Sequence, residues 1–349
     1  IISHSHYQIG TINSPPSNRL FVAVRQTTGF TMHRYASFLL IVTCLFQPPA
    51  AIAAIVTTPA TTVEHALGQA TITGRPDRVV SLYQGATDTA VALGIKPIGV
   101  VESWTEKPMY QYLREDLQGV TYLGLETQPD LERIAWLSPD LIVGARNRHR
   151  TIYPLLQRIA PTVIPGDVYD FKALLTLMAT ATGRTARGEE LLTHWQERVE
   201  DFRTRIRQKL GEQWPQEVAI LSFRADHARI YYGGFARSVL DELGFTAPAS
   251  HRQDSWGIKL TSQESIPAMD AEAVFIFMED DPAVRRTFNT WSSHPLWKNL
   301  QAVRQNDVYQ VDPVTWNMGA GIIAANRMLD ALYKHYGLHQ PEHRGCAPC

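Results

Sequence analysis

Two stretches of the sequence, one in each half of the chain, follow the same plan. In residues 132–143, a Glu-x-Ile triplet is followed by an acidic residue, eight positions after the Glu, and then by a short apolar run. Residues 264–277 repeat this order at the same spacing. Equal spacing indicates an internal duplication, so the fold has to accommodate two similar units. The alternative is a pair of unrelated helix–strand units.

Around these stretches, short apolar runs rich in β-branched residues alternate with helix-like segments that end at glycines. In the first half the predicted strands are 78–83, 95–101 and 139–144, with helices over 89–93 and 131–137. In the second half the predicted strands are 218–223, 229–232 and 273–277, with a helix over 236–243. Strands that alternate with helices are typical of parallel, doubly wound α/β sheets.

Between the halves, residues 171–210 are helical in pattern, and Gly183 predicts a break into two helices. Apolar side chains recur there at steps of three and four, at Leu192, Trp195, Val199, Phe202, Ile206 and Leu210. Such a stripe predicts one packed helix of about 25 residues and nearly 40 Å. The predicted fold is α/β, with two doubly wound lobes joined by a single long rigid helix and a ligand cleft between the lobes.

The first residues have the pattern of an export signal rather than of a folded element. Residues 1–31 precede the first methionine, and we expect them not to be part of the native protein. Residues 32–53 combine a short positive region, an apolar run and a small-x-small site, which predicts a signal peptide. Lipidation at Cys44 is the alternative. The predicted domains are a first lobe at 54–170, a connector at 171–210, a second lobe at 211–337 and a tail at 338–349.

Composition excludes several classes of protein. The formal net charge of -1 lacks the basic excess of a generic nucleic-acid binder. Hydrophobic residues make up 44%, enough for a packed interior, and 19% charged residues are too few for a disordered chain. Three cysteines form no disulfide framework, and the terminal pair Cys346 and Cys349 predicts a peripheral tail, closed or not by a small disulfide.

Enzyme and metal motifs are largely missing from the sequence. It has no phosphate-binding loop, no G-x-S-x-G and no H-E-x-x-H. Residues 319–324 fit G-x-G-x-x-A but do not follow a strand directly, so we expect them to open the last helix. The acidic residues 279–281 predict a solvated turn. The histidines show no metal-ligand spacing, so we expect no metal site.

Arginines and aromatic residues follow several predicted strands, where open α/β sheets bind their ligands. Tyr83 and Trp104 follow the first two strands, a basic segment at 146–150 follows the third, and Arg224 follows a strand of the second half. Guanidinium groups match carboxylates and aromatic rings give broad contact surface, so this set suits an anionic, partly apolar ligand. The alternative is a solvated basic loop with tryptophans in the core.

Four segments carry a resemblance to a known family. Residues 78–82, 93–100, 129–134 and 138–143 resemble the corresponding segments of the periplasmic substrate-binding proteins of ABC importers for iron–siderophores and cobalamin. The resemblance covers 76–336. It implies two α/β lobes bridged by one long helix, and one acidic residue per lobe that meets arginines of the permease. Glu132 and Glu264 match those positions, although a helix-start glutamate favoured by the helix dipole is the alternative.

The resemblance also implies arginines and aromatic residues in the cleft. With the strand-end analysis, it makes the following residues candidates for ligand binding: Tyr83, Trp104, Arg146, Arg148, Arg224, Tyr232, Trp256 and Trp316. We therefore expect a monomeric periplasmic protein that captures a ferric siderophore, of ferric citrate or hydroxamate type. It would deliver this chelate to an ABC permease dimer in the inner membrane, with no cofactor, no catalysis and no nucleic-acid partner. The alternatives are cobalamin, haem, or an enzyme that uses the same cleft.

Overall fold

The computed structural model describes residues 60–339. The predicted signal peptide, Cys44 and the Cys346–Cys349 pair lie outside these residues, and the domain boundaries of the chain stay predictions. Within the described range, every helix is too short or too polar to cross a membrane.

The first lobe is built on a six-stranded sheet with the strand order β6-β5-β4-β3-β7-β8. Its strands are β3 (Val79–Ser81), β4 (Gly99–Glu102), β5 (Thr121–Leu125), β6 (Gln128–Pro129), β7 (Leu141–Val143) and β8 (Thr162–Val163). Neighbouring strands pair in parallel, except for β5 with β6. The chain adds strands first on one side of β3 and then on the other, so the sheet is doubly wound. A hairpin of β1 (Ala60–His65) and β2 (Gly68–Thr73) precedes it.

Helices connect the strands of the first lobe, and one more helix follows its last strand. They are α1 (Gln84–Ala92), α2 (Leu131–Trp136), α3 (Arg146–His149), α4 (Tyr153–Ile159) and α5 (Phe171–Ala181). The helix predicted over 89–93 begins already at Gln84, directly after β3. The prediction missed this turn because Gly85 disfavours a helix, but every residue of α1 is buried, and tertiary packing outweighs intrinsic propensity.

The second lobe has a five-stranded sheet with the order β11-β10-β9-β12-β13. Its strands are β9 (Val218–Phe223), β10 (Ala228–Tyr231), β11 (Gly257–Leu260), β12 (Ala273–Met278) and β13 (Val308–Val311). The predicted α/β lobe is confirmed, but this sheet is mixed, since β10 runs antiparallel to both of its neighbours. Only residues 224–227 separate β9 from β10, and a parallel pair needs a much longer crossover.

The helices of the second lobe are α7 (Phe235–Leu243), α8 (Pro282–Ser292), α9 (Gln301–Gln305) and α10 (Ile322–His335). Helix α7 ends at Gly244, whose φ of 94° lies in the left-handed region that glycine adopts without strain. A short π-helical turn, Val314–Met318, precedes α10.

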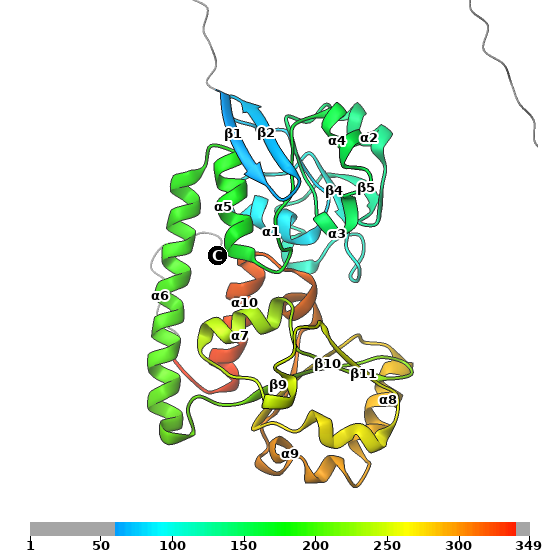
Figure 1. Ribbon diagram of the computed structural model, residues 1–349, viewed down its shortest axis with the longest axis vertical. Helices are drawn as coiled ribbons and strands as arrows, with labels where there is room; N and C mark the ends of the chain where they lie inside the picture. The colour runs from blue at the N-terminus through cyan, green and yellow to red at the C-terminus, as the bar shows by residue number, and fades with distance from the viewer. Residues whose placement is uncertain (1–59, 340–349) are drawn as a thin grey trace, which may run out of the picture. The chain divides into compact units, whose positions relative to one another are not determined.

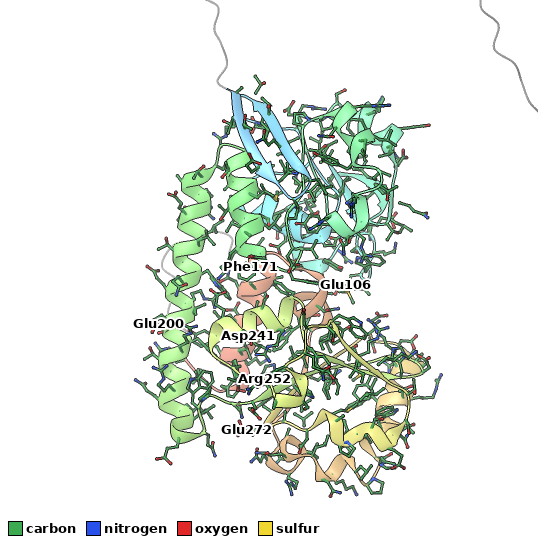
Figure 2. The ribbon with its side chains drawn as sticks, in the orientation of Figure 1. Glu106, Phe171, Glu200, Asp241, Arg252 and Glu272 are labelled. Atoms are coloured by element: carbon green, nitrogen blue, oxygen red, sulfur yellow. The ribbon has the colours of Figure 1, made fainter. Side chains whose placement is uncertain are left out.

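The long helix predicted between the lobes is α6 (Thr185–Leu210), with 26 residues. The predicted break is confirmed at Gly183, whose positive φ of 63° separates α5 from α6. Helix α6 packs on α5 and also on α7 and α10 (Figure 1). Its outer face is polar, and Glu200 extends from it into solvent (Figure 2). One continuous helix therefore contacts elements of both lobes.

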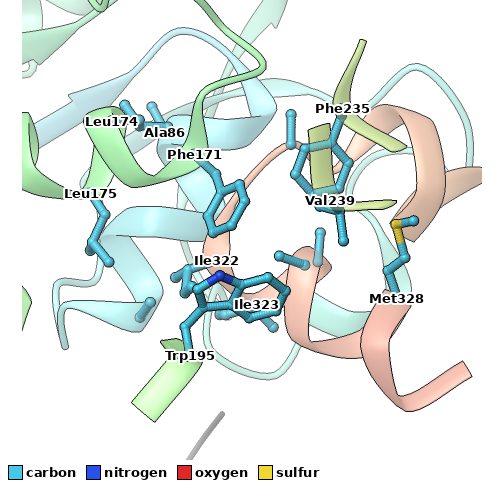
Figure 3. Packing of buried hydrophobic residues seen from close by; sticks show 14 of the residues in the cluster. Ala86, Phe171, Leu174, Leu175, Trp195, Phe235, Val239, Ile322, Ile323 and Met328 are labelled. Carbon is cyan, nitrogen blue, oxygen red and sulfur yellow. The ribbon is translucent and has the colours of Figure 1, made fainter. Parts of the chain in front are cut away.

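Aromatic side chains join α6 to its neighbours (Figure 3). The ring of Trp195 on α6 lies 5.3 Å from that of Phe171 on α5, edge to face. Phe171 in turn lies 5.9 Å from Phe235 on α7. Of the predicted apolar stripe, Trp195, Val199, Phe202 and Ile206 are fully buried, and Leu192 and Leu210 are half-buried. These residues belong to one core cluster that includes side chains of both lobes.

A buried polar contact fixes α6 against α10. The Arg198 guanidinium, 4% exposed, donates to Asn326 Oδ1 and to Asp330 Oδ1, each at 2.5 Å. The hydroxyl of Tyr333 on α10 donates to Asp201 Oδ2 at 2.6 Å. Buried polar groups need partners, so these bonds set the relative position of the two helices more narrowly than apolar packing does.

Asp88 of α1 caps the N-terminus of α10. Its Oδ1 accepts from the Ile323 N–H at 2.9 Å, and its Oδ2 accepts from the Ala324 N–H at 3.0 Å and from the Tyr112 hydroxyl at 2.8 Å. A Cβ at Gly321 would lie 2.2 Å from Asp88 Oδ1, so only glycine allows this approach. Burial raises the pKa of Asp88 to about 7, although the three donors oppose this rise.

We predict that Asp88 makes the protein less stable as the pH rises towards neutrality. Between about pH 4 and pH 7 the folded protein keeps a proton on Asp88 that the unfolded chain has released. Raising the pH from 5 to 7.5 should therefore lower the free energy of unfolding by about 2 kcal/mol through this group. Urea unfolding of wild type and Asp88→Asn at both pH values measures it. Equal pH dependence in the two proteins would contradict the prediction.

Candidate ligand-binding site

A cavity of about 480 Å³ lies where the carboxyl ends of the two sheets face each other. Most of its wall is formed by residues that come soon after β3, β4, β5, β7 and β8 of the first lobe and after β9, β12 and β13 of the second. Carboxyl ends of parallel strands open at one edge of a sheet, so both lobes direct their strand-end loops into one space. The volume is within the range of small-molecule sites.

Arg148 and Glu126 form the charged pair of the first lobe. Arg148 Nε, on α3, lies 3.2 Å from Glu126 Oε1, and the guanidinium lies 5.3 Å above the ring of Trp104. The indole N–H of Trp104 donates to Glu126 Oε2 at 3.2 Å. The Glu126 side chain is only 10% exposed, and this burial raises its pKa, while Arg148 opposes the rise.

His149 holds this part of the wall in place. The Ala145 N–H donates to its Nδ1 at 2.8 Å, so its Nε2 carries the proton and donates to the backbone oxygen of Glu126 at 2.8 Å. The ring is fully buried, which lowers its pKa and keeps it neutral. His149 therefore connects the residue after β5 to the helix that carries Arg148.

Arg224 and Glu279 form the charged pair of the second lobe. Strands β9 and β12 run parallel with Phe223 opposite Met278, so the residues that follow each strand come side by side. Arg224 Nη1 lies 2.5 Å from Glu279 Oε1. Arg224 Nε is buried and has no hydrogen-bond partner among the described residues, so it is a donor left for a ligand.

Arg229 of β10 is a third guanidinium group in the wall of the cavity. It lies 5.7 Å over the ring of Trp256, and its Nε donates to His227 Nε2 at 2.9 Å. His227 Nδ1 is 2.6 Å from Asp226 Oδ1, which supplies an acceptor for the proton on that nitrogen. Unlike the other two arginines, Arg229 forms no ion pair with a described carboxylate.

Two further polar atoms at the cavity lack partners. The hydroxyl of Tyr83 and the Oε1 of Gln84 are buried without a hydrogen bond to any described residue. Both residues line the cavity, and each is at most 3% exposed. Burial raises the pKa of Tyr83 well above its ordinary value, so the phenol is a neutral donor. Polar atoms that are buried and unpaired next to a cavity suit contacts with a bound molecule.

Four of the eight predicted ligand-binding residues lie in the cavity wall. They are Tyr83, Trp104, Arg148 and Arg224. The wall also contains residues that the sequence analysis did not select: Glu126, Tyr169, Arg229, Glu279 and Asn317. Glu279 comes directly after β12, which the sequence analysis predicted at 273–277, so the rule that identified Arg224 would have found it. Glu126 follows β5, a strand that the sequence analysis did not predict. We had instead assigned Glu279 to a solvated acidic turn.

Arg146 and Trp316 are not part of this wall. Arg146 stands two residues before Arg148 on α3, and helix positions two apart face different sides. It lines a neighbouring hollow with Arg150 and Asp167. Trp316 is fully buried and packs on Phe275 with ring centroids 4.7 Å apart. The π-helical turn directs Trp316 into the core, while the two residues after it reach the cavity.

Tyr232 and Trp256 also lie outside the cavity wall. Tyr232 lines a hollow beside α7 and stacks near His251 at 5.5 Å. Trp256 is 55% exposed and covers the Arg229 guanidinium from outside. Strand β10 runs antiparallel to β9, with Tyr231 opposite Ile220 and Gly257, so Tyr232 and Trp256 lie towards the amino end of β9, away from the carboxyl ends that form the cavity.

Glu132 and Glu264 lie away from the cavity, one on each lobe. Glu132 is exposed in the first turn of α2, and Glu264 is exposed in the 3-10 turn Gln263–Met269. The isoleucines of the two repeated triplets, Ile134 and Ile266, are both fully buried. The duplicated stretches thus share one exposed glutamate and one core residue.

No group of three histidine, cysteine or acidic side chains within residues 60–339 is arranged to hold a metal ion. The charged groups of the cavity are paired arginines and glutamates, with Arg229 in addition. These groups can bind a ligand through hydrogen bonds and charge.

Known proteins are similar to this chain in sequence and in fold. The chain is 49% identical to the achromobactin-binding periplasmic protein of Dickeya dadantii, over 75% of this chain and 87% of that protein. It is 39% identical to the probable siderophore-binding lipoprotein YfiY of Bacillus subtilis, over 79% and 87%. The crystal structure of Staphylococcus aureus SirA with staphyloferrin B superposes with a TM-score of 0.77 at 40% identity, over 80% of this chain and all of that one.

Residues 79–315 match the family described as periplasmic binding protein. This match covers both sheets, α6 and the cavity residues up to Glu279. It agrees with the resemblance found in the sequence and with the two lobes joined by a long helix. The chain belongs to the periplasmic binding protein family.

Proposed function

We propose that this protein captures a ferric chelate whose chelator bears carboxylates and delivers it to an ABC importer. The observation that carries the proposal is that Arg148, Arg224 and Arg229, from both lobes, line one cavity. Guanidinium groups bind carboxylates through paired, charge-assisted hydrogen bonds, and a ligand that contacts both lobes at once gains from each. The siderophore-related names of the relatives support the same class of cargo.

The iron reaches this protein as part of the cargo. Each of the two glutamates in the cavity is paired with an arginine, and no group of three possible metal ligands lies within residues 60–339, so the chelator holds the ferric ion. The protein acts by binding and release, without making or breaking a bond. Trp104 and Tyr169 supply flat apolar surface for the body of the chelate, while the arginines fix its carboxylates.

The partner on the membrane is an ABC permease. Glu132 and Glu264 are exposed on separate lobes, outside the cavity, so both are free to meet a second protein while cargo is bound. Charge complementarity between such carboxylates and permease arginines would set the register of docking and raise the encounter rate. We infer that the protein is exported, through the signal peptide predicted at 32–53, and works as a monomer.

Removing Arg148 or Arg224 from the cavity should weaken cargo binding. A charge-assisted hydrogen bond contributes about 1.5–3 kcal/mol, so Arg148→Ala and Arg224→Ala should each raise Kd by about tenfold or more. Isothermal titration against ferric citrate, a ferric hydroxamate, a ferric catecholate, haem and cobalamin identifies the cargo class and then measures the loss. Arg146→Ala is the matched control, because it removes the same group two residues away and outside the cavity. Binding of only haem or cobalamin would contradict the proposed cargo.

The two exposed glutamates should matter for delivery and not for capture. Glu132→Ala combined with Glu264→Ala should abolish uptake of the radiolabelled ferric chelate by cells that carry the permease, with Kd changed less than about twofold. Glu197→Ala with Glu200→Ala is the control, since it removes two exposed carboxylates from the outer face of α6. Normal uptake by the first double variant, or a large loss of affinity, would refute the docking role.

A further inference from the structure

Each lobe contributes to the cavity one arginine that is paired with a glutamate. Arg148 pairs with Glu126 in the first lobe, and Arg224 pairs with Glu279 in the second. With Arg229 added, three guanidinium groups face two carboxylates, so the lining carries one net positive charge. For a cavity that is to bind an anionic molecule, two carboxylates in the wall need an explanation.

Strand register and hydrogen bonds hold both pairs in the wall of the cavity. Glu279 is brought next to Arg224 by the parallel register of β9 and β12. Glu126 is held by His149 through its backbone and by Trp104 through its side chain, and it stays 10% exposed. A carboxylate that is mostly buried costs free energy unless it has such partners. Both glutamates are therefore positioned groups and not mobile surface charges.

We propose that Glu126 and Glu279 are specificity-determining residues that make the cavity select the iron-loaded chelate over the iron-free chelator. The inference rests on the proposed function, which supplies the class of cargo. In the empty cavity the two glutamates act as internal counter-ions for Arg148 and Arg224. A carboxylate of the ligand has to replace a glutamate as the hydrogen-bond acceptor of these arginines.

Charge explains the selection. The two glutamates reduce the net charge that the three arginines give the lining, and the attraction lost in this way grows with the negative charge of the ligand, so an iron-free polycarboxylate loses most. In a complex with one chelator per iron, the ferric ion cancels three negative charges and a coordinated hydroxyl restores one by losing its proton, so the loaded chelate is less negative than the free chelator and loses less of the attraction. It still has carboxylate oxygens for the donors that the protein leaves available, among them the buried Arg224 Nε and the Arg229 guanidinium.

Size adds to this selection. A small anion that exchanges with one glutamate replaces one charge-assisted hydrogen bond by another and gains little. A chelate that spans the cavity contacts the arginines of both lobes together, so its second contact is made without a second loss of translational freedom. The two glutamates therefore weaken the binding of small or highly charged anions more than they weaken the binding of a rigid, multivalent and weakly charged chelate.

The test replaces the carboxylates by amides of the same shape. Glu126→Gln, Glu279→Gln and the double variant are titrated calorimetrically with ferric citrate prepared at one citrate per iron and with iron-free citrate, at one pH and ionic strength. We expect the double variant to bind iron-free citrate at least about tenfold more tightly than wild type does, because the lining gains two net positive charges. Its preference for ferric citrate over iron-free citrate should fall by at least about the same factor.

The control keeps the change in net charge and moves it out of the cavity. Glu102→Gln with Glu242→Gln also removes two carboxylates that pair with cations, Lys107 and Lys172, but neither glutamate lines the cavity. This variant should bind iron-free citrate as wild type does. If it gains as much affinity as the cavity variant, the effect is one of overall charge and the proposal is overturned.

The outcomes separate this proposal from the proposed function. If wild type binds none of the ferric chelates, the proposed function fails, and the iron-free citrate titration still tests the counter-ions. Unchanged or weaker citrate binding in a folded double variant overturns the counter-ion proposal, whichever chelate the wild type prefers. Glu279→Gln alone, at the more exposed of the two pairs, repeats the comparison if the double variant does not fold.

Discussion

The packing of α6 against both lobes is the contact on which the rest of this structure depends. Trp195 and Phe171 join it to the first lobe, and Arg198 joins it to α10 through a buried hydrogen bond to Asn326 and a partly buried one to Asp330. A helix whose own backbone bonds are satisfied along 26 residues resists bending far more than a flexible linker does. Both lobes pack on the same helix, so the carboxyl ends of their sheets face one cavity.

The chemistry of the cavity follows from sheet topology. Parallel strands end at one edge, and residues one step beyond neighbouring ends meet, as Arg224 and Glu279 do. The first lobe reaches a similar result by another route, because β5 and β7 are not neighbours and His149 links the residues that follow them. The two lobes thus present similar charged pairs through different local structure.

Several elements could be predicted because their signal is local. The stripe on α6 and the glycine stops at Gly183 and Gly244 are periodic or conformational features that neighbouring residues decide. Other features depended on distant partners. Helix α1 begins at Gln84 because its surroundings bury it completely, and Trp316 belongs to the core because Phe275 lies beside it. No local pattern encodes either contact.

The sequence by itself determined that the chain has two α/β lobes, one stiff helix between them and arginines with aromatic residues after the strands. Hydrophobic periodicity and strand-end position are read along the chain, so they need no knowledge of distant contacts. The tertiary structure alone decided which of those side chains share the cavity. It separated Arg148 from Arg146, and it brought Glu126 and Glu279 to the arginines. Side-chain direction and strand register depend on packing between segments far apart in sequence, which only the folded chain fixes.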